Sequence, residues 1–168
     1  MCAGILACAG KPTLHFASDP AARFDHLRTW AWYDDPTFQM PGGGSIVDGR
    51  FVDEHVRAAV DRGLTKKGLQ KVETGQADLN VAYHTDTVGV VSQDKFGGYD
   101  WWSGYVYVGA KYQKKGALTL DIRDAKYKLV WRGEMEAIVG RNPEAIARDI
   151  DNAVAELLSK FPPGGATR

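Results

Sequence analysis

The sequence is poor in cysteine and lacks an excess of charge of either sign. Its 168 residues include two cysteines, Cys2 and Cys8, and both lie among the first ten residues. Because the rest of the chain has no cysteine, a disulfide framework and a cysteine-based metal site are excluded there. Lys and Arg together number 21, as do Asp and Glu. This balance argues against a nucleic-acid-binding protein, which is usually basic.

Long apolar runs and the signatures of common catalytic sites are also missing. No apolar stretch approaches the roughly 20 residues that a membrane-spanning helix needs. The four histidines form no His-Glu-x-x-His pair, and no Gly-x-Ser-x-Gly motif is present. We therefore expect no catalytic residues, no metal ligands and no cofactor. A hydrolase site that uses His84 and Asp86, which we place at a strand end, is the least favoured hypothesis.

The residues that are present predict one globular domain. Hydrophobic residues make up 44% of the chain and charged residues 25%, proportions that are typical of a globular protein with one core. Apolar residues alternate in some segments and recur at helical spacing in others. These patterns predict an α+β fold, with a mostly antiparallel sheet of about five or six strands and two long helices packed on one face. We expect a single domain over residues 13–163.

Segments with strand and helix patterns follow one another along the chain. Apolar residues at helical spacing predict a helix over Phe51–Gly68, and Asn142 and Pro143 are suited to begin a second helix that runs to Phe161. Residues Ala21–Leu27 can form about two helical turns. Strands are predicted over Thr13–Ser18, Thr29–Tyr33, Leu69–Glu73 and Asp78–Thr85, with Thr87–Val91 continuing the last strand or pairing with it.

The segment Leu118–Val139 predicts a β-hairpin, because two alternating runs flank a polar turn. Opposite residues of an antiparallel pair share a face, so a loop of Ala125–Lys128 is needed to align the apolar residues. This register places Ile122 opposite Trp131, Leu118 opposite Met135, and Asp121 opposite Arg132. We interpret Asp121 and Arg132 as an ion pair on a solvated face rather than as part of an active site. Gly133 within the second strand indicates a bulge or a close approach by a neighbour such as Trp131.

The N-terminal segment has features of a processed lipoprotein signal. In Met1–Gly10, the short apolar run Ile5-Leu6-Ala7 precedes Cys8, as in a bacterial lipobox. Leu6 is larger than the residue usual at that position, the apolar stretch is short, and no basic segment precedes it. On these residues alone, a disordered terminus with incidental cysteines is an equal alternative. In the first interpretation, residues 1–12 are a signal-peptide remnant and lipid tether, and residues 164–168 are a disordered tail.

One segment, Phe96–Gly109, is rich in glycine and aromatic residues, and its one charged residue is Asp100. Strands flank it, so it is predicted to be an extended hairpin tip or a flexible loop. Exposed aromatic side chains often mark contacts with partners, glycans or membrane interfaces. The alternative is that these residues pack locally within the strands. The candidate contact surface consists of Tyr99, Trp101, Trp102, Tyr105 and Tyr107.

Six segments follow one another in an order that is more specific than any one motif. They are Phe24–Trp32, Leu64–Leu69, Asp78–His84, Gly116–Asp124, Val130–Gly133 and Phe161–Pro163. Together, from about Leu14 to Pro163, they resemble one family, the bacterial envelope lipoproteins classed as domain of unknown function 4136. The chain departs from the family pattern at Ala117, where Thr is usual, and in the turn over 126–128, which lacks the usual Gly.

The resemblance implies a cellular location more than a chemical activity. It favours the lipobox interpretation of Cys8, and hence export and attachment to an envelope membrane, with the outer membrane favoured because Ala9 is not an Asp retention signal. It offers no catalytic residues to carry over. We therefore expect a non-enzymatic lipoprotein domain on the periplasmic face, with a structural or interaction role and an envelope protein or glycan as partner. The alternative is a small-molecule, glycan or peptide binding module that uses Phe96–Gly109. The sequence does not define the oligomeric state.

Overall fold

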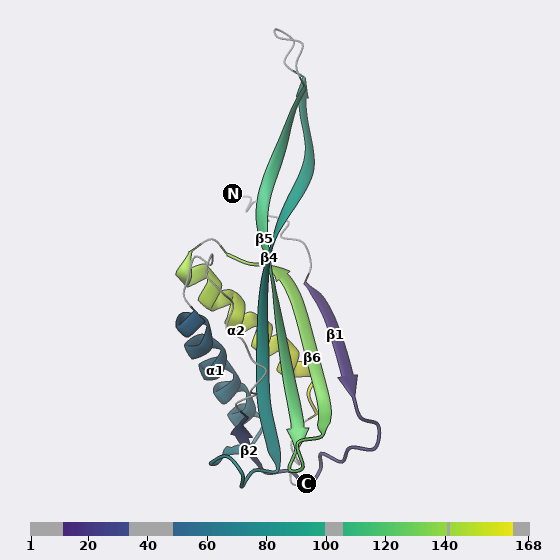
Figure 1. The fold of residues 1–168 in the computed structure, drawn as a ribbon, viewed down its shortest axis with the longest axis vertical. Helices are drawn as coiled ribbons and strands as arrows, with labels where there is room; N and C mark the ends of the chain where they lie inside the picture. Colours follow the sequence, from purple (N-terminus) through teal and green to yellow (C-terminus); the bar gives the residue numbers. More distant parts are fainter. Residues whose placement is uncertain (1–11, 34–48, 100–105, 141, 163–168) are drawn as a thin grey trace, which may run out of the picture.

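The computed structural model describes residues 12–33, 49–99, 106–140 and 142–162, which form a six-stranded sheet and two helices (Figure 1). The strand order in the sheet is β1-β6-β5-β4-β2-β3. Strands β1, β6, β5 and β4 pair antiparallel, and the short β2 pairs in parallel with β4 and β3. The predicted α+β class is confirmed. The elements are β1 (Thr13–Ser18), β2 (Thr29–Trp32), α1 (Gly49–Lys66), β3 (Gln70–Lys71), β4 (Leu79–Tyr99), β5 (Val106–Asp124), β6 (Leu129–Ile138) and α2 (Pro143–Lys160).

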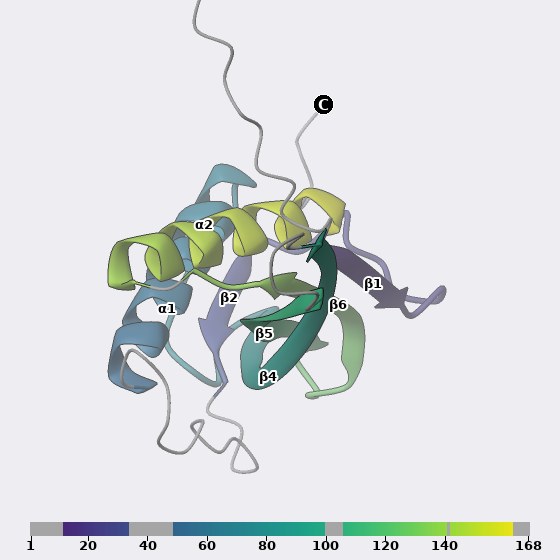
Figure 2. The same cartoon turned by 90° about the horizontal axis from the view of Figure 1, so that it is seen from above.

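Both helices lie on the same side of the sheet, as Figure 2 shows. Helix α1 begins two residues before the predicted start and ends at Lys66, after which Gly68 adopts φ +82°, a conformation suited to glycine. Helix α2 begins after Asn142, whose side chain accepts a hydrogen bond from the amide of Ala145 at 2.8 Å. The two helices approach closely at Gly63, where an added Cβ would lie 2.4 Å from Cδ1 of Leu158.

The hydrophobic core lies between the helices and the sheet. In the body of the sheet, alternate residues of β4, β5 and β6, such as Val81, Leu120 and Trp131, pack with apolar residues that the helices supply at helical spacing. At one end of this core, the ring centroids of Trp131 and Phe161 lie 5.4 Å apart at 72°, a favourable edge-to-face arrangement. The fully buried side chains include Trp30, Val56, Val60, Leu64, Leu79, Val81, Leu120, Ile122, Val154, Leu157 and Phe161.

The β5–β6 hairpin has the register that the sequence predicts. Ile122 pairs with Trp131, Leu118 with Met135, and Asp121 with Arg132. The register shifts between Ile122 and Arg123, so the bulge lies near the turn and not at Gly133.

Gly133 is instead a site of close approach. An added Cβ there would lie 2.4 Å from Cη2 of Trp131 and 3.1 Å from Cδ2 of Leu157.

The prediction of helical turns over Ala21–Leu27 is wrong, because this segment contains only turns and irregular backbone. Its end is held by Asp78, far along the chain, whose carboxylate accepts hydrogen bonds from the amides of Arg28 at 2.8 Å and Thr29 at 2.9 Å. Burial opposes ionisation of Asp78, but the hydrogen bonds from Arg28 and Thr29 outweigh it and hold the pKa of that carboxyl below its ordinary value. A two-turn helix without a packed apolar face has too little stability to compete with this contact.

Candidate functional site

A long β-hairpin projects from one end of the body (Figure 1). The pairing of β5 with β6 ends at Lys115 and Ile138, and the pairing of β2 with β4 ends at Trp32 and Val81. Beyond these pairs, among the described residues, β4 and β5 pair only with each other. We call this part, Gly89–Tyr99 with Val106–Lys114, the arm. At roughly 3.4 Å per residue, the nine residues Val106–Lys114 extend about 30 Å.

Two of the five residues of the predicted aromatic surface lie at the distal end of the arm. Tyr99 pairs with Val106, and Tyr107 pairs with Gly98, so both tyrosines lie in the last described pairs of the ladder. The other three residues of that surface, Trp101, Trp102 and Tyr105, lie outside the described residues, as does Cys8. The ladder has an irregularity between Gln93 and Gly97. The sequence predicts either an extended hairpin tip or a flexible loop for Phe96–Gly109. The described parts of this segment, residues 96–99 and 106–109, form an extended hairpin.

A buried carboxylate lies on the sheet face opposite the helices, and the prediction of a solvated Asp121 is wrong. The Asp121 side chain is 0% exposed. Its two oxygens accept hydrogen bonds from Nε and Nη2 of Arg132, both at 2.6 Å, and Nη2 of Arg123 lies 3.6 Å away. The hydrogen-bonded Asp121 carboxylate raises the pKa of Arg132. This bidentate geometry is the strong form of an ion pair, and it joins the β5 and β6 strands.

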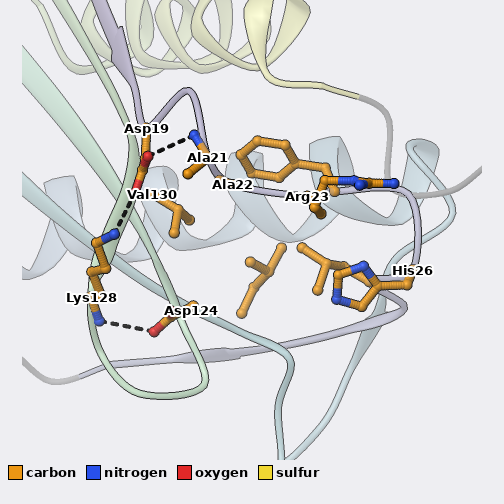
Figure 3. Close-up of a pocket in the computed structure, with 11 residues that line it drawn as sticks. Asp19, Ala21, Ala22, Arg23, His26, Asp124, Lys128 and Val130 are labelled. Carbon is orange, nitrogen blue, oxygen red and sulfur yellow. Dashed lines mark hydrogen bonds and ion pairs between the residues drawn. The ribbon is translucent and has the colours of Figure 1, made fainter.

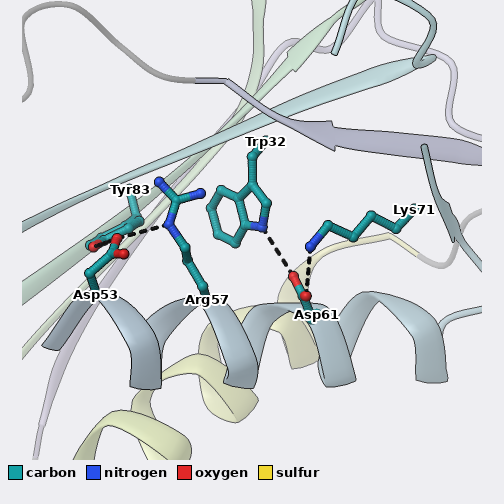
Figure 4. Close-up of polar contacts among 6 residues, drawn as sticks. All are labelled: Trp32, Asp53, Arg57, Asp61, Lys71 and Tyr83. Carbon is teal, nitrogen blue, oxygen red and sulfur yellow. Dashed lines mark hydrogen bonds and ion pairs between the residues drawn. The ribbon is translucent and has the colours of Figure 1, made fainter. Parts of the chain in front are cut away.

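A line of polar contacts joins α1 to β2, β3 and β4 (Figure 4). The Asp53 carboxylate accepts hydrogen bonds from the hydroxyl of Tyr83 at 2.6 Å and from Nε of Arg57 at 2.8 Å. The Arg57 guanidinium lies over the Trp32 ring, 4.7 Å from its centroid. Burial raises the pKa of Tyr83, and the nearby carboxylate raises it further. Tyr83 is therefore a hydrogen-bond donor here and not a source of phenolate.

The same line continues toward the end of α1. Asp61 accepts hydrogen bonds from Nε1 of Trp32 at 3.1 Å and from Nζ of Lys71 at 2.7 Å. The two carboxylates on α1 thus hold side chains from three strands. Sequence reasoning did not identify this line, although the spacing of Asp53, Arg57 and Asp61 at every fourth residue places them on one helix face and could have indicated it.

A pocket of about 250 Å³ lies where residues 19–28 cross the ends of β4, β5 and β6 (Figure 3). Its lining includes the buried side chains of Leu27, Leu79 and Val130. The charged residues at the pocket are partnered within the protein. Lys128 pairs with Asp19, and Arg23 and His26 both approach the neighbouring Asp25, at 3.5 Å and 3.6 Å. The pocket therefore combines an apolar wall with polar side chains that already have partners within the protein.

The structure corrects the place of the predicted histidine site. His84 lies within β4 and pairs with Thr119 of β5. Because β4 continues well past Asp86, neither His84 nor Asp86 is at a strand end. In the described part of the chain, no three metal-ligating side chains gather in one place. No helix within the described ranges has the length and apolar character required to cross a membrane.

The fold and its projecting arm define a class of protein: a sheet covered by helices on one face, with one hairpin extended beyond the body. Comparison with protein families then identifies the family. The model of the family described as domain of unknown function (DUF4136) matches residues 15–163. The chain belongs to this family, and the resemblance noted in the sequence is confirmed.

Solved structures share the fold at low sequence identity. A DUF4136 family protein from Bacteroides thetaiotaomicron has a TM-score of 0.53 and 18% identity, over 90% of this chain and 96% of that one. The PelC dodecamer from Paraburkholderia phytofirmans has a TM-score of 0.54 and 13% identity, over 94% of this chain and 100% of that one. A PDZ domain protein from Parabacteroides distasonis has a TM-score of 0.55 and 13% identity, over 90% of this chain and 36% of that one. A search of curated proteins found no match.

Proposed function

We propose that the chain is a non-enzymatic domain of the bacterial cell envelope, tethered by a lipid on Cys8, that acts through contacts with other envelope components. Copies of itself are among those components. The observation that carries the proposal is the arm. An isolated two-stranded ribbon is marginally stable in water, and the outer edges of its strands offer unpaired backbone groups to a partner. An arm of this length is an element built for contact.

Four carboxylates among the described residues support a structural role. Asp53 and Asp61 hold strands to α1, Asp78 holds the segment before β2, and Asp121 joins β5 to β6 through Arg132. Each is engaged by donors from other elements. Carboxylates used in this way stabilise the fold, and an active site needs such groups aimed at a substrate.

Self-association is supported by the fold neighbours. The PelC structures of the same fold are dodecamers. At 13% identity this likeness concerns the fold, so the oligomer is part of the proposal. The outer edges of the arm, which pair with no other strand among the described residues, give each copy a surface that a neighbouring copy can cover.

Expression of the complete gene product in a bacterial host tests the proposal. Membrane fractionation followed by mass spectrometry of the N-terminal peptide should find lipid on Cys8, and native mass spectrometry of the detergent extract should find more than one copy. Cys8→Ser should move the protein to the soluble periplasmic fraction. A soluble cytosolic product with an unmodified Cys8 would contradict the proposal.

The alternative function, a binding module for a small molecule, glycan or peptide, uses the same end of the arm. It predicts that Trp101→Ala combined with Trp102→Ala abolishes ligand binding and leaves the melting temperature nearly unchanged. If the double variant unfolds instead, these tryptophans belong to the core and the alternative is wrong.

A further inference from the structure

We infer that the distal end of the arm rests on a lipid surface, so that the domain contacts its membrane at two places, the tether and the arm. The inference rests on the proposed function for the tether at Cys8. It follows from where the first strand begins, how long the arm is, and how charge is distributed along it.

The tether and the arm leave the body at the same end. Thr13, the first residue of β1, pairs with Glu136; Glu136 pairs with Ala117 on its other side; and Ala117 pairs with Asp86. These four residues form one row across the sheet, and the arm begins at Gly89, just beyond that row. Figure 1 shows the same arrangement, with β1 running away from the end of the body that carries the arm. A membrane attached ahead of Thr13 therefore faces the base of the arm.

The arm is longer than the tether. Fully extended, the chain from Cys8 to Thr13 reaches at most about 17 Å at roughly 3.4 Å per residue. The arm extends about 30 Å by the same rise per residue. A tether this short holds the arm end of the body near the bilayer, and an arm of nearly twice that length reaches the bilayer surface.

The charged residues of the arm's strands lie short of its last described pairs. Lys111 and Lys114 belong to the half nearer the body, and Asp94 and Lys95 lie in the irregularity between Gln93 and Gly97. The paired residues Gly97–Tyr99 and Val106–Val108 carry no charge and include two tyrosines.

Aromatic residues with a polar group favour the membrane–water interface. The last described pairs of the arm, which are uncharged and include two tyrosines, therefore fit a lipid surface better than they fit a charged protein partner.

The unpaired edges set the depth of the contact. A single two-stranded ribbon cannot cross the hydrocarbon region, because its outer N–H and C=O groups would have no partner there. In the hydrated headgroup layer these groups bind water and lipid headgroups. The contact is thus interfacial, and it should not require anionic lipid.

Vesicle flotation with the full chain tests the inference. The Cys8→Ser chain removes the lipid, so any binding to phosphatidylcholine vesicles comes from the protein surface alone. In the arm-replaced variant, residues 89–114 give way to Asn-Gly, a two-residue hairpin turn that joins the paired residues Val88 and Lys115. The matched control is Phe16→Ser, which removes an exposed aromatic ring, 40% exposed, from β1.

We expect the Cys8→Ser chain to float with phosphatidylcholine vesicles. The arm-replaced variant should bind these vesicles at least about tenfold more weakly. The Phe16→Ser control should bind like the parent, and all three should show cooperative unfolding at similar temperatures. Failure of the Cys8→Ser chain to bind, equal binding by the arm-replaced variant, or binding restricted to phosphatidylglycerol-containing vesicles would each overturn the inference.

The two proposals fail separately in these experiments. If mass spectrometry finds Cys8 unmodified while the arm still binds vesicles, the tether is wrong and the arm contact stands. If Cys8 carries lipid and the arm does not affect flotation, the tether stands and the arm contact is wrong.

Discussion

Removing Arg132 should destabilise the fold more than removing its partner Asp121, although both belong to one ion pair. The reason is the difference in exposure, because the Asp121 side chain is 0% exposed and the Arg132 side chain 44% exposed. In Arg132→Leu, a buried carboxylate keeps only the more distant Arg123, 3.6 Å away. In Asp121→Asn, the arginine left behind is already in contact with water.

The magnitudes follow from this difference. Leaving a buried charge without its partner costs about 3–5 kcal/mol, and Arg123 should reduce that cost, so we expect Arg132→Leu to lower the free energy of unfolding by about 2–4 kcal/mol. Asp121→Asn weakens two hydrogen bonds without burying a new charge and should cost about 1–2 kcal/mol. The double variant should resemble Asp121→Asn alone, because the pair acts as a unit.

Urea unfolding followed by circular dichroism at fixed protein concentration measures these differences. A matched control is Arg62→Leu, which removes an ion pair with Asp151 of similar length, 2.7 Å, whose side chains are 56% and 52% exposed. That control should cost less than about 1 kcal/mol. If Arg132→Leu costs no more than Arg62→Leu, or less than Asp121→Asn, the assignment of Asp121 as a buried and paired carboxylate is wrong.

Three further variants test the packing, the turn and the pH dependence. Gly133→Ala should lower the free energy of unfolding by about 1–3 kcal/mol, because the added Cβ forces the Trp131 ring to move. In a double-mutant cycle of melting curves, Trp131→Phe should relieve part of that cost. Additive costs of the two substitutions would contradict the contact. Tyr127 has φ 62°, a backbone conformation that is unfavourable for most side chains but tolerated by Asn. Tyr127→Asn should therefore stabilise the fold by about 0.5 kcal/mol, even though it removes the ring contact with Tyr33. A lower free energy of unfolding in urea would count against this. The depressed pKa of Asp78 means that its ionised form favours the folded state. Its contribution is complete above the unfolded value of about 3.9 and is lost as the pH falls through the lower folded value. Asp78→Asn should therefore flatten the loss of stability below about pH 4, and an unchanged acid profile would refute the role of that carboxylate.

The hairpin register was predictable because two local rules agree. Strand alternation assigns each residue to a face, and the apolar residues of both strands align only when the loop is Ala125–Lys128. The helices were predictable for a similar reason, since apolar residues at helical spacing and the cap at Asn142 both lie within one segment. Departures from the prediction occur where a distant residue decides the structure.

Burial of Asp121 is one such departure. Alternation gives the face of the sheet on which the carboxylate lies, but not whether arginine side chains fold over it. The segment before β2 is another, because the Asp78 carboxylate that holds its end lies 49 residues from Thr29. The length of the arm was not predictable from its glycine-rich composition, which fits a loop as well as a twisted ribbon.

The central claim is that the arm is a contact element, and hydrogen exchange measured by mass spectrometry tests it most directly. Backbone amides of Gly89–Tyr99 and Val106–Lys114 should exchange slowly in the lipidated, membrane-bound protein and rapidly in the Cys8→Ser chain without vesicles. Residues 118–122 of β5, which pair with strands on both sides, should stay protected in both samples. Equal exchange of the arm in the two samples would contradict the claim.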